Sequence, residues 1–150
     1  MEILTKEEAR GYSPGALAFY GDCVWEILVR RKLLGKGNAP SAKLHKQSVE
    51  LVRASFQSRA ADIIEKLLTE EEADIIRRGR NATGLSVPKS STPKEYHRAT
   101  GFEALFGFLS LVGEFERAET LFEVIWNERE KDKREKSQGK EGQGKKEAEG

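Results

Sequence analysis

The chain has 150 residues, of which 37% are apolar and 34% charged, which suits one domain with a hydrophobic core and a very polar surface. Its 26 basic and 25 acidic side chains nearly cancel, which argues against a nucleic-acid partner when the whole chain is averaged. The single cysteine, Cys23, excludes an internal disulfide and a cysteine-based zinc site. Residues 1–10 lack the apolar region of a secretory signal, and no apolar run approaches the roughly 18 residues of a membrane span. We therefore expect a cytoplasmic protein without a membrane partner.

Residues 1–126 show helical patterns throughout and predict one all-α domain. The first helix follows the N-cap Ser13, and a later one begins at the capping box of Thr69 and Glu72. Another start is marked by Thr92, with a proline at the next position and a glutamate two residues later. Six helices are expected, over residues 14–34, 42–56, 58–68, 70–79, 93–112 and 114–126.

Two polar segments interrupt or follow these helices. Residues 79–91 form a loop rich in Gly, Pro, Ser and Asn, and a loop of that length in a small domain is often functional. Residues 127–150 contain one apolar side chain, eight basic and seven acidic ones. Such a composition cannot bury enough surface to offset its chain entropy. We therefore predict one folded domain over 1–126 and a disordered charged tail over 127–150, whose simplest role is to keep the protein soluble.

Asp22 is the most informative residue of the first helix. Ala18, Phe19, Trp25 and Val29 lie three, four or seven positions away, so the carboxylate is expected to point at or near the core. A buried carboxylate must be protonated, paired or bound to a metal. The preceding glycine costs a helix about 1 kcal/mol relative to alanine, which is reasonable if another backbone or a ligand comes close.

Glu103 repeats this pattern on the fifth helix. It lies among Ala99, Phe106 and Gly107, so that two helices each bring one carboxylate into an apolar setting. Two carboxylates and water are ligands that suit Mg²⁺ or Mn²⁺. The alternative is that each acid lies at the rim of the core or pairs with an Arg or Lys. A di-iron site is disfavoured, because neither histidine follows a glutamate by three residues.

Two motifs around these acids resemble a known family. Residues 17–26, LAFYGDCVWE, resemble the Gly-Asp signature of ribonuclease III domains, and residues 100–107, TGFEALFG, resemble their second motif. The segments RRGRNA at 77–82, VPK at 87–89 and LHK at 44–46 resemble the Mini-ribonuclease III branch of that family. Two acids of longer family members are replaced here by Ala18 and Thr100, as in that branch.

The resemblance implies an all-α ribonuclease III endonuclease-domain bundle that acts as a homodimer. It implies Mg²⁺-dependent cleavage of double-stranded RNA to 5′-phosphate and 3′-hydroxyl ends, with Mn²⁺ as a substitute, in the processing of 23S ribosomal RNA precursors. Asp22 would be the principal metal ligand and Glu103 the second. A large-subunit ribosomal protein on the substrate is a further expected partner. The alternative is a catalytically weak or silent module that only binds RNA or ribosomal particles.

The other candidate site residues are less specific. Glu26 either supports the metal ligands from behind or pairs with Arg30 four residues later, and we favour the pair. Leu17, Trp25, Phe106 and Phe108 belong either to the core or to a dimer contact, and the sequence does not separate the two.

Residues 77–98 are the expected RNA contact. They carry six basic side chains and one acid, whereas the rest of residues 1–126 carries 12 basic and 17 acidic ones, so the neutral total hides a local excess. The first two arginines also close a helix that begins with three glutamates, and this alone could explain them. The RNA-binding candidates are Arg77, Arg78, Arg80, Asn81 and Lys89.

Overall fold

The computed structural model describes the backbone of residues 2–148 and the side chains of residues 2–141. Every regular element in that part of the chain is a helix, which confirms the predicted all-α fold. None of its helices is long and apolar enough to cross a membrane. The elements are α1 (Lys6–Arg10), α2 (Pro14–Gly35), α3 (Ser41–Val52), α4 (Ala54–Ile64), a 3₁₀ turn (Glu65–Leu67), α5 (Glu70–Arg80), α6 (Pro93–Leu111) and α7 (Phe115–Ala148).

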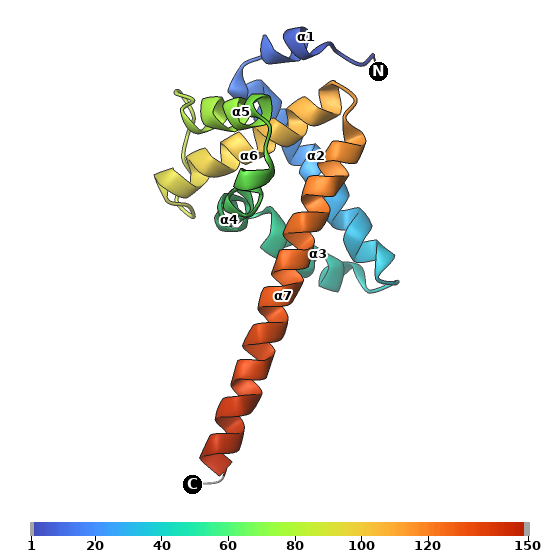
Figure 1. Ribbon diagram of the computed structural model, residues 1–150, viewed down its shortest axis with the longest axis vertical. Helices are drawn as coiled ribbons and strands as arrows, with labels where there is room; N and C mark the ends of the chain where they lie inside the picture. Colours follow the sequence, from blue (N-terminus) through green and yellow to red (C-terminus); the bar gives the residue numbers. More distant parts are fainter. Residues whose placement is uncertain (1, 149–150) are drawn as a thin grey trace.

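Helix α6 is the centre of the bundle. It packs against α2, α4, α5 and the first turns of α7, while α3 lies against α2 (Figure 1). Trp25 of α2 meets the rings of Phe102 and Phe106 of α6 edge-on, with centroids 4.8 and 5.0 Å away. Leu17, Trp25, Phe106 and Phe108 are all at most 1% exposed. These four side chains therefore belong to the core and are not available for a dimer contact.

The predicted helix starts are confirmed at their caps. The Ser13 hydroxyl accepts a hydrogen bond from the amide of Ala16, and the Thr69 and Thr92 hydroxyls accept from the amides three residues on. The sequence analysis missed α1, although Thr5 and Glu8 form a complete capping box. It also merged residues 42–56 into one helix, whereas Arg53 has ψ 151° and separates α3 from α4.

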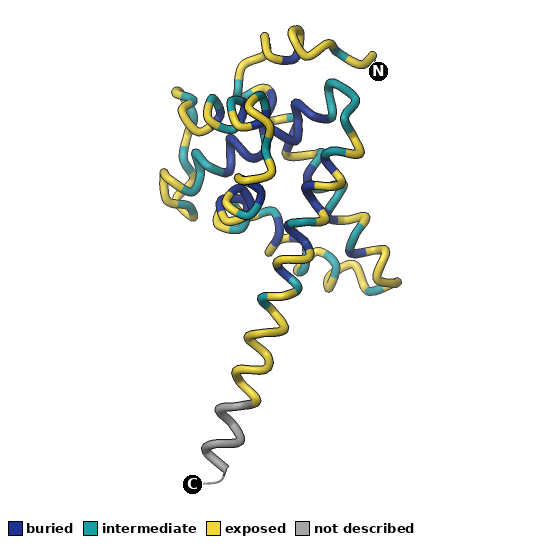
Figure 2. The backbone as a smooth tube through the Cα atoms, viewed as in Figure 1, coloured by how far each residue is buried: buried dark blue, intermediate teal, exposed yellow. Residues whose placement is uncertain are grey.

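The last helix is longer than expected. Residues 127–148 continue α7 as a helix, where the composition predicts disorder. Up to Arg129, which is 9% exposed, α7 packs on the body; beyond it, α7 projects into solvent (Figures 1 and 2). Lys, Glu and Arg have good intrinsic helix propensities. A charged segment that starts from a packed helix therefore extends it without burying apolar surface.

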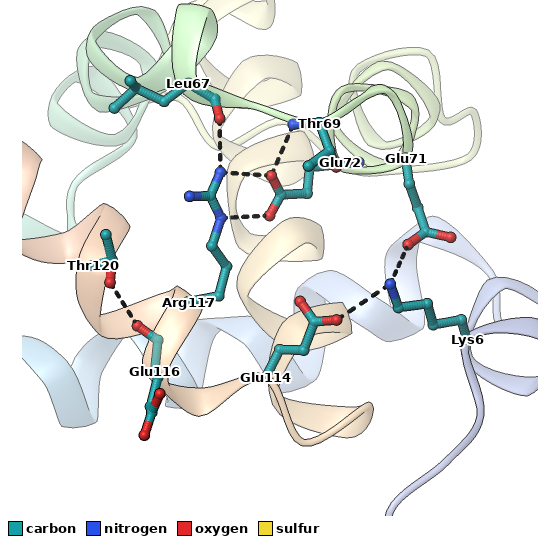
Figure 3. Close-up of polar contacts among 9 residues, drawn as sticks. All are labelled: Lys6, Leu67, Thr69, Glu71, Glu72, Glu114, Glu116, Arg117 and Thr120. Atoms are coloured by element: carbon teal, nitrogen blue, oxygen red, sulfur yellow. Dashed lines mark hydrogen bonds and ion pairs between the residues drawn. The ribbon is translucent and has the colours of Figure 1, made fainter.

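The start of α7 is fastened to α5 by one arginine. Arg117 donates from Nε to Glu72 Oε2 at 3.0 Å, and from Nη2 to Glu72 Oε1 at 2.8 Å and the Leu67 carbonyl at 2.7 Å (Figure 3). Burial raises the pKa of the Glu72 carboxyl, but hydrogen bonds from Arg117 and Thr69 outweigh it and leave the pKa lowered. Nearby, Lys6 pairs with Glu71 and Glu114 and ties the N-terminus to the same corner (Figure 3).

Candidate functional site

Two glycines bring α2 and α6 into backbone contact. A Cβ atom on Gly21 would lie 1.7 Å from the Glu103 carbonyl oxygen, and one on Gly107 would lie 2.1 Å from the Leu17 carbonyl oxygen. Only glycine permits this approach. The expectation that Gly21 accommodates another backbone is therefore confirmed. Because Asp22 follows Gly21 and Glu103 lies at the crossing, the two predicted carboxylates come from the point where the helices touch.

The two carboxyl groups influence each other. Desolvation, and then the charge of Asp22, raises the pKa of Glu103 to about 7, and a contact with Gln57 lowers it slightly. Desolvation and the charge of Glu26 raise the pKa of Asp22. Neither acid has a hydrogen-bonded Arg or Lys partner in the described part of the chain, so the alternative that each is simply salt-bridged is not supported.

Asp22 lies at the rim of the core, which was the alternative to a carboxylate that points into it. Its side chain is exposed to solvent, while Ala18, Trp25 and Val29 on the same side of α2 are buried. Gly21 occupies the crossing point with α6, so the next residue lies at the edge of the crossing instead of inside the core. Glu103 is partly buried beside it. The site therefore has one solvent-facing and one half-buried carboxylate, an arrangement open to a large substrate.

Gln57 is a site residue that the sequence analysis missed. It lies on α4, is 1% exposed and contacts Glu103, yet its Nε2 atom has no well-formed hydrogen bond. Burying such an amide without partners costs free energy. The signal was available, because Gln57 shares a helix face with the buried Ala60, Ala61 and Ile64. A buried polar side chain aimed at a carboxylate marks this point as a built site.

Glu26 is engaged elsewhere. Arg30 donates from Nε to its Oε1 at 3.1 Å, which confirms the favoured pair. The positions Ala18 and Thr100 are both 6% exposed, and the Thr100 hydroxyl donates to the Tyr96 carbonyl at 2.9 Å. Within the described residues no cluster of three or more His, Cys, Asp or Glu could hold a metal. Two carboxylates suit Mg²⁺, which keeps water ligands and takes others from substrate phosphates.

A second glycine pair positions the basic segment. A Cβ atom on Gly79 would lie 2.5 Å from the Gly101 Cα, and one on Gly101 would lie 2.4 Å from the Ile76 carbonyl oxygen. The expected helix end at Gly79 is one residue early, because α5 continues to Arg80, and Gly79 contacts Gly101 of α6. The segment that starts here is therefore held against the helix that carries Glu103.

The structure divides the predicted RNA-binding residues into two groups. Arg77 pairs with Asp74, and Arg78 donates to the Tyr12 carbonyl at 3.3 Å. Arg80 ends α5, Asn81 lines an open hollow beside the start of α2, and Lys89 lies exposed in the loop. In the described part of the chain, none of these last three has an ion pair or a side-chain hydrogen bond. They are the residues left free to contact a ligand.

Comparison with known proteins gives a consistent result. A model of the ribonuclease III domain matches residues 15–114. The chain is similar to a Mini-ribonuclease 3 of Thermoanaerobacter, with 46% identity over 123 residues, 82% of this chain and 87% of that protein. It is similar to a Mini-ribonuclease 3 of Symbiobacterium thermophilum, with 44% identity over 75% of this chain and 84% of the relative. A crystal structure of a Fusobacterium nucleatum protein superposes with a TM-score of 0.72 at 31% identity, over 80% of this chain and 96% of that one.

Proposed function

This chain belongs to the ribonuclease III family and is an endoribonuclease, and we propose that it cuts double-stranded RNA at Asp22 and Glu103 with the help of Mg²⁺. The family acts on double-stranded RNA. The observation that supports the proposal is the glycine crossing of α2 and α6, because Asp22 and Glu103 lie beside it and the charge of Asp22 raises the pKa of Glu103, with the buried Gln57 behind Glu103. Mn²⁺ is an expected substitute for Mg²⁺, because both accept carboxylate oxygens.

The roles of the side chains follow from their exposure. When bound, a divalent cation lowers the pKa of water and neutralises charge on the scissile phosphate. Asp22, which faces solvent, is the principal ligand and the first carboxylate that a phosphate would approach. Glu103 is the second ligand, and its half-buried position restricts its motion. Gln57 is buried behind Glu103 on the core side, and its role in the proposal is that of a positioning residue that limits where the Glu103 carboxyl can lie. The products would carry 5′-phosphate and 3′-hydroxyl ends.

A homodimer is part of the proposal. Phe19 is 83% exposed and Ile27 is 58% exposed, and Cys23 between them is exposed as well. These side chains recur every four residues along α2, the helix that carries Asp22. Exposed apolar side chains in such a row favour contact with another protein surface. A second copy seated here would place the two sites near one interface.

The basic segment supplies substrate affinity in this proposal. Arg80, Asn81 and Lys89 contact phosphates and ribose hydroxyls, which is how proteins mostly recognise A-form duplexes. The proposed substrate is the 23S ribosomal RNA precursor, cut in the cytoplasm with a large-subunit ribosomal protein bound to it.

The test is cleavage of a long RNA duplex with Mg²⁺, with and without a chelator. Asp22→Asn should lower the cleavage rate at least about 10³-fold, because several kcal/mol of charge stabilisation are lost, while folding and RNA binding persist. Full activity in that variant would reject the assignment. Binding without cleavage by the unaltered chain would support the silent RNA-binding module, which the small carboxylate set favours. Mapping the cuts on precursor RNA, bare and protein-bound, then tests the substrate.

A further inference from the structure

A second cationic surface lies away from the segment 77–98. It is a shallow groove of about 300 Å³ between α7 and the junction of α3 and α4. Five cations line it, namely Arg53, Arg59, Arg129, Lys133 and Lys136. Glu50 and Asp132 are the only acids in its lining. The groove therefore has a clear excess of positive charge, although the tail that contributes to it is almost neutral in composition.

Ion pairs engage only part of this charge. Arg129, whose side chain is 10% exposed, lies 3.7 Å from Glu50 and 3.1 Å from Glu130, and it stacks over Trp126. Arg59 lies 4.0 Å from Asp132. By contrast, Arg53, Lys133 and Lys136 are exposed and have no carboxylate within 4 Å among the described residues. Three cations of the groove thus face solvent, beside the buried Arg129 and the paired Arg59.

The helical period extends this surface along α7. Lys133, Lys136 and Lys140 are spaced by three and four residues, so they lie on one face in line with Arg129. At 1.5 Å per residue, the line from Arg129 to Lys140 is about 16 Å long. Glu128, Glu135 and Glu141 fall on other faces, together with Lys131 and Arg134, while Asp132 borders the stripe and pairs with Arg59. The helix therefore gathers Arg129, Lys133, Lys136 and Lys140 into one basic stripe, a result that composition alone conceals.

We propose that this stripe, defined as Lys133, Lys136 and Lys140 with Arg53, binds the phosphate backbone of double-stranded RNA beyond the cleavage site. The proposal rests on the proposed function. A line of lysines spaced by single helical turns, without an apolar pocket, fits an extended polyanion. Such contacts position a duplex without reading its sequence. Arg53 lies one turn of α4 before Gln57, so the groove is joined to the site through one helix.

The orientation of α7 supports this role. Helix α7 projects beyond the body (Figure 1), and its residues 133–141 are exposed. A duplex longer than the body would run beside this projection. In this proposal the stripe adds affinity only for a duplex long enough to contact Asp22 and Glu103 together with Lys136 and Lys140.

The test compares two matched variants in the full chain, both carrying Asp22→Asn to prevent cleavage. The stripe variant is Lys133→Gln/Lys136→Gln, and the control is Lys131→Gln/Arg134→Gln, which lies in the same stretch of α7 but on other faces. Both lose two positive charges, and Gln keeps good helix propensity. Affinity for a long RNA duplex is measured against salt concentration, and helix content is checked by circular dichroism.

The stripe variant should show a salt slope smaller by about one for each lost phosphate contact, and several-fold weaker binding at low salt. The control should match the parent on the long duplex, and all three proteins should match on a short one. Equal slopes for stripe and control would overturn the proposal, because net charge alone would then explain the binding. So would the same loss on short and long duplexes. Equal slopes with intact cleavage by the unaltered chain reject only the stripe, whereas a chain that neither binds nor cuts duplex RNA rejects the proposed function itself.

Discussion

Helix α6 crosses α2 and α5 at glycine pairs, and side chains of opposite charge lie beside the two crossings. At the crossing with α2, Gly21 and Gly107 bring together the carboxylates of Asp22 and Glu103. At the crossing with α5, Gly79 and Gly101 hold the start of a basic segment. In both cases the charged side chains lie beside the contact and not within it. Because glycine has no side chain, the helix backbones can touch at these four positions, and that contact determines where the neighbouring charged side chains lie.

The largest expected effect comes from a side chain that prevents the close contact of α2 and α6 at the first crossing. Gly21→Ala puts a Cβ atom 1.7 Å from a backbone oxygen that cannot move aside. We expect a loss of at least about 3 kcal/mol in unfolding free energy, together with loss of cleavage. At the second crossing, Gly79→Ala meets a gentler clash of 2.5 Å and should cost less. Denaturant unfolding measures both.

The control for these variants is Gly35→Ala, because a Cβ atom there meets nothing within 4 Å. It should leave stability unchanged or raise it by up to about 1 kcal/mol. If Gly21→Ala proved as mild as Gly35→Ala, the close crossing would not describe the molecule in solution.

A smaller effect is the dependence of stability on pH, which is expected at the first crossing because Glu103 lies there. The pKa of Glu103 is raised from 4.5 to about 7, so the folded metal-free protein keeps a proton that the unfolded chain has already released. This contribution to stability is present at acidic pH and is lost as pH rises from about 4.5 through about 7, by up to about 3 kcal/mol. Thermal unfolding in the presence of a chelator measures it.

Glu103→Gln is the matched control, because its amide stays neutral over this range. The difference in stability between variant and parent should therefore grow with pH up to about 7. A constant difference would contradict the raised pKa. Glu72 has a lowered pKa and acts in the opposite sense, since its contribution is lost as pH falls, but it is common to both proteins.

The smallest effect is expected from the basic segment 77–98, which begins at the second crossing. Arg80→Gln/Lys89→Gln should reduce the salt slope of duplex binding by about one for each lost contact, with stability unchanged. Lys43→Gln/Lys66→Gln removes the same charge from exposed positions outside the segment 77–98 and should leave the slope as it was. The same slope in both double variants would mean that the segment contributes only net charge.

The sequence predicted three helices that carry their own start signals, although α1, which begins at the capping box of Thr5 and Glu8, was missed. Ser13, Thr69 and Thr92 are strong caps, and a cap is a local property of a few residues. The break at Arg53 has no such signal, because it depends on how α3 and α4 pack. The end of α5 was placed one residue early at Gly79 for the same reason, since a glycine at a helix end and one at a helix contact are identical in sequence.

The sequence singled out the two carboxylates that lie beside the α2–α6 crossing, but it did not give their orientation. Helical spacing identified Asp22 and Glu103 as unusual, yet whether a side chain lies inside or beside a crossing depends on which neighbour touches the other helix. Gln57 contacts Glu103 across 46 positions of sequence, and no local pattern joins the two. The helix over 127–148 was missed because disorder was inferred from composition, which ignores the order of the charges.

The contact of Arg117 with Glu72 bears on the order in which the chain folds during synthesis. Its partners lie 45 and 50 residues earlier, so α5 leaves the ribosome well before the guanidinium that neutralises it. Until then the Glu72 carboxylate remains hydrated, because burying it without a partner would cost about 3–5 kcal/mol. We therefore expect the Glu72 corner of α5 to reach its final packing only once Arg117 is available to pair with it, late in the synthesis of the domain.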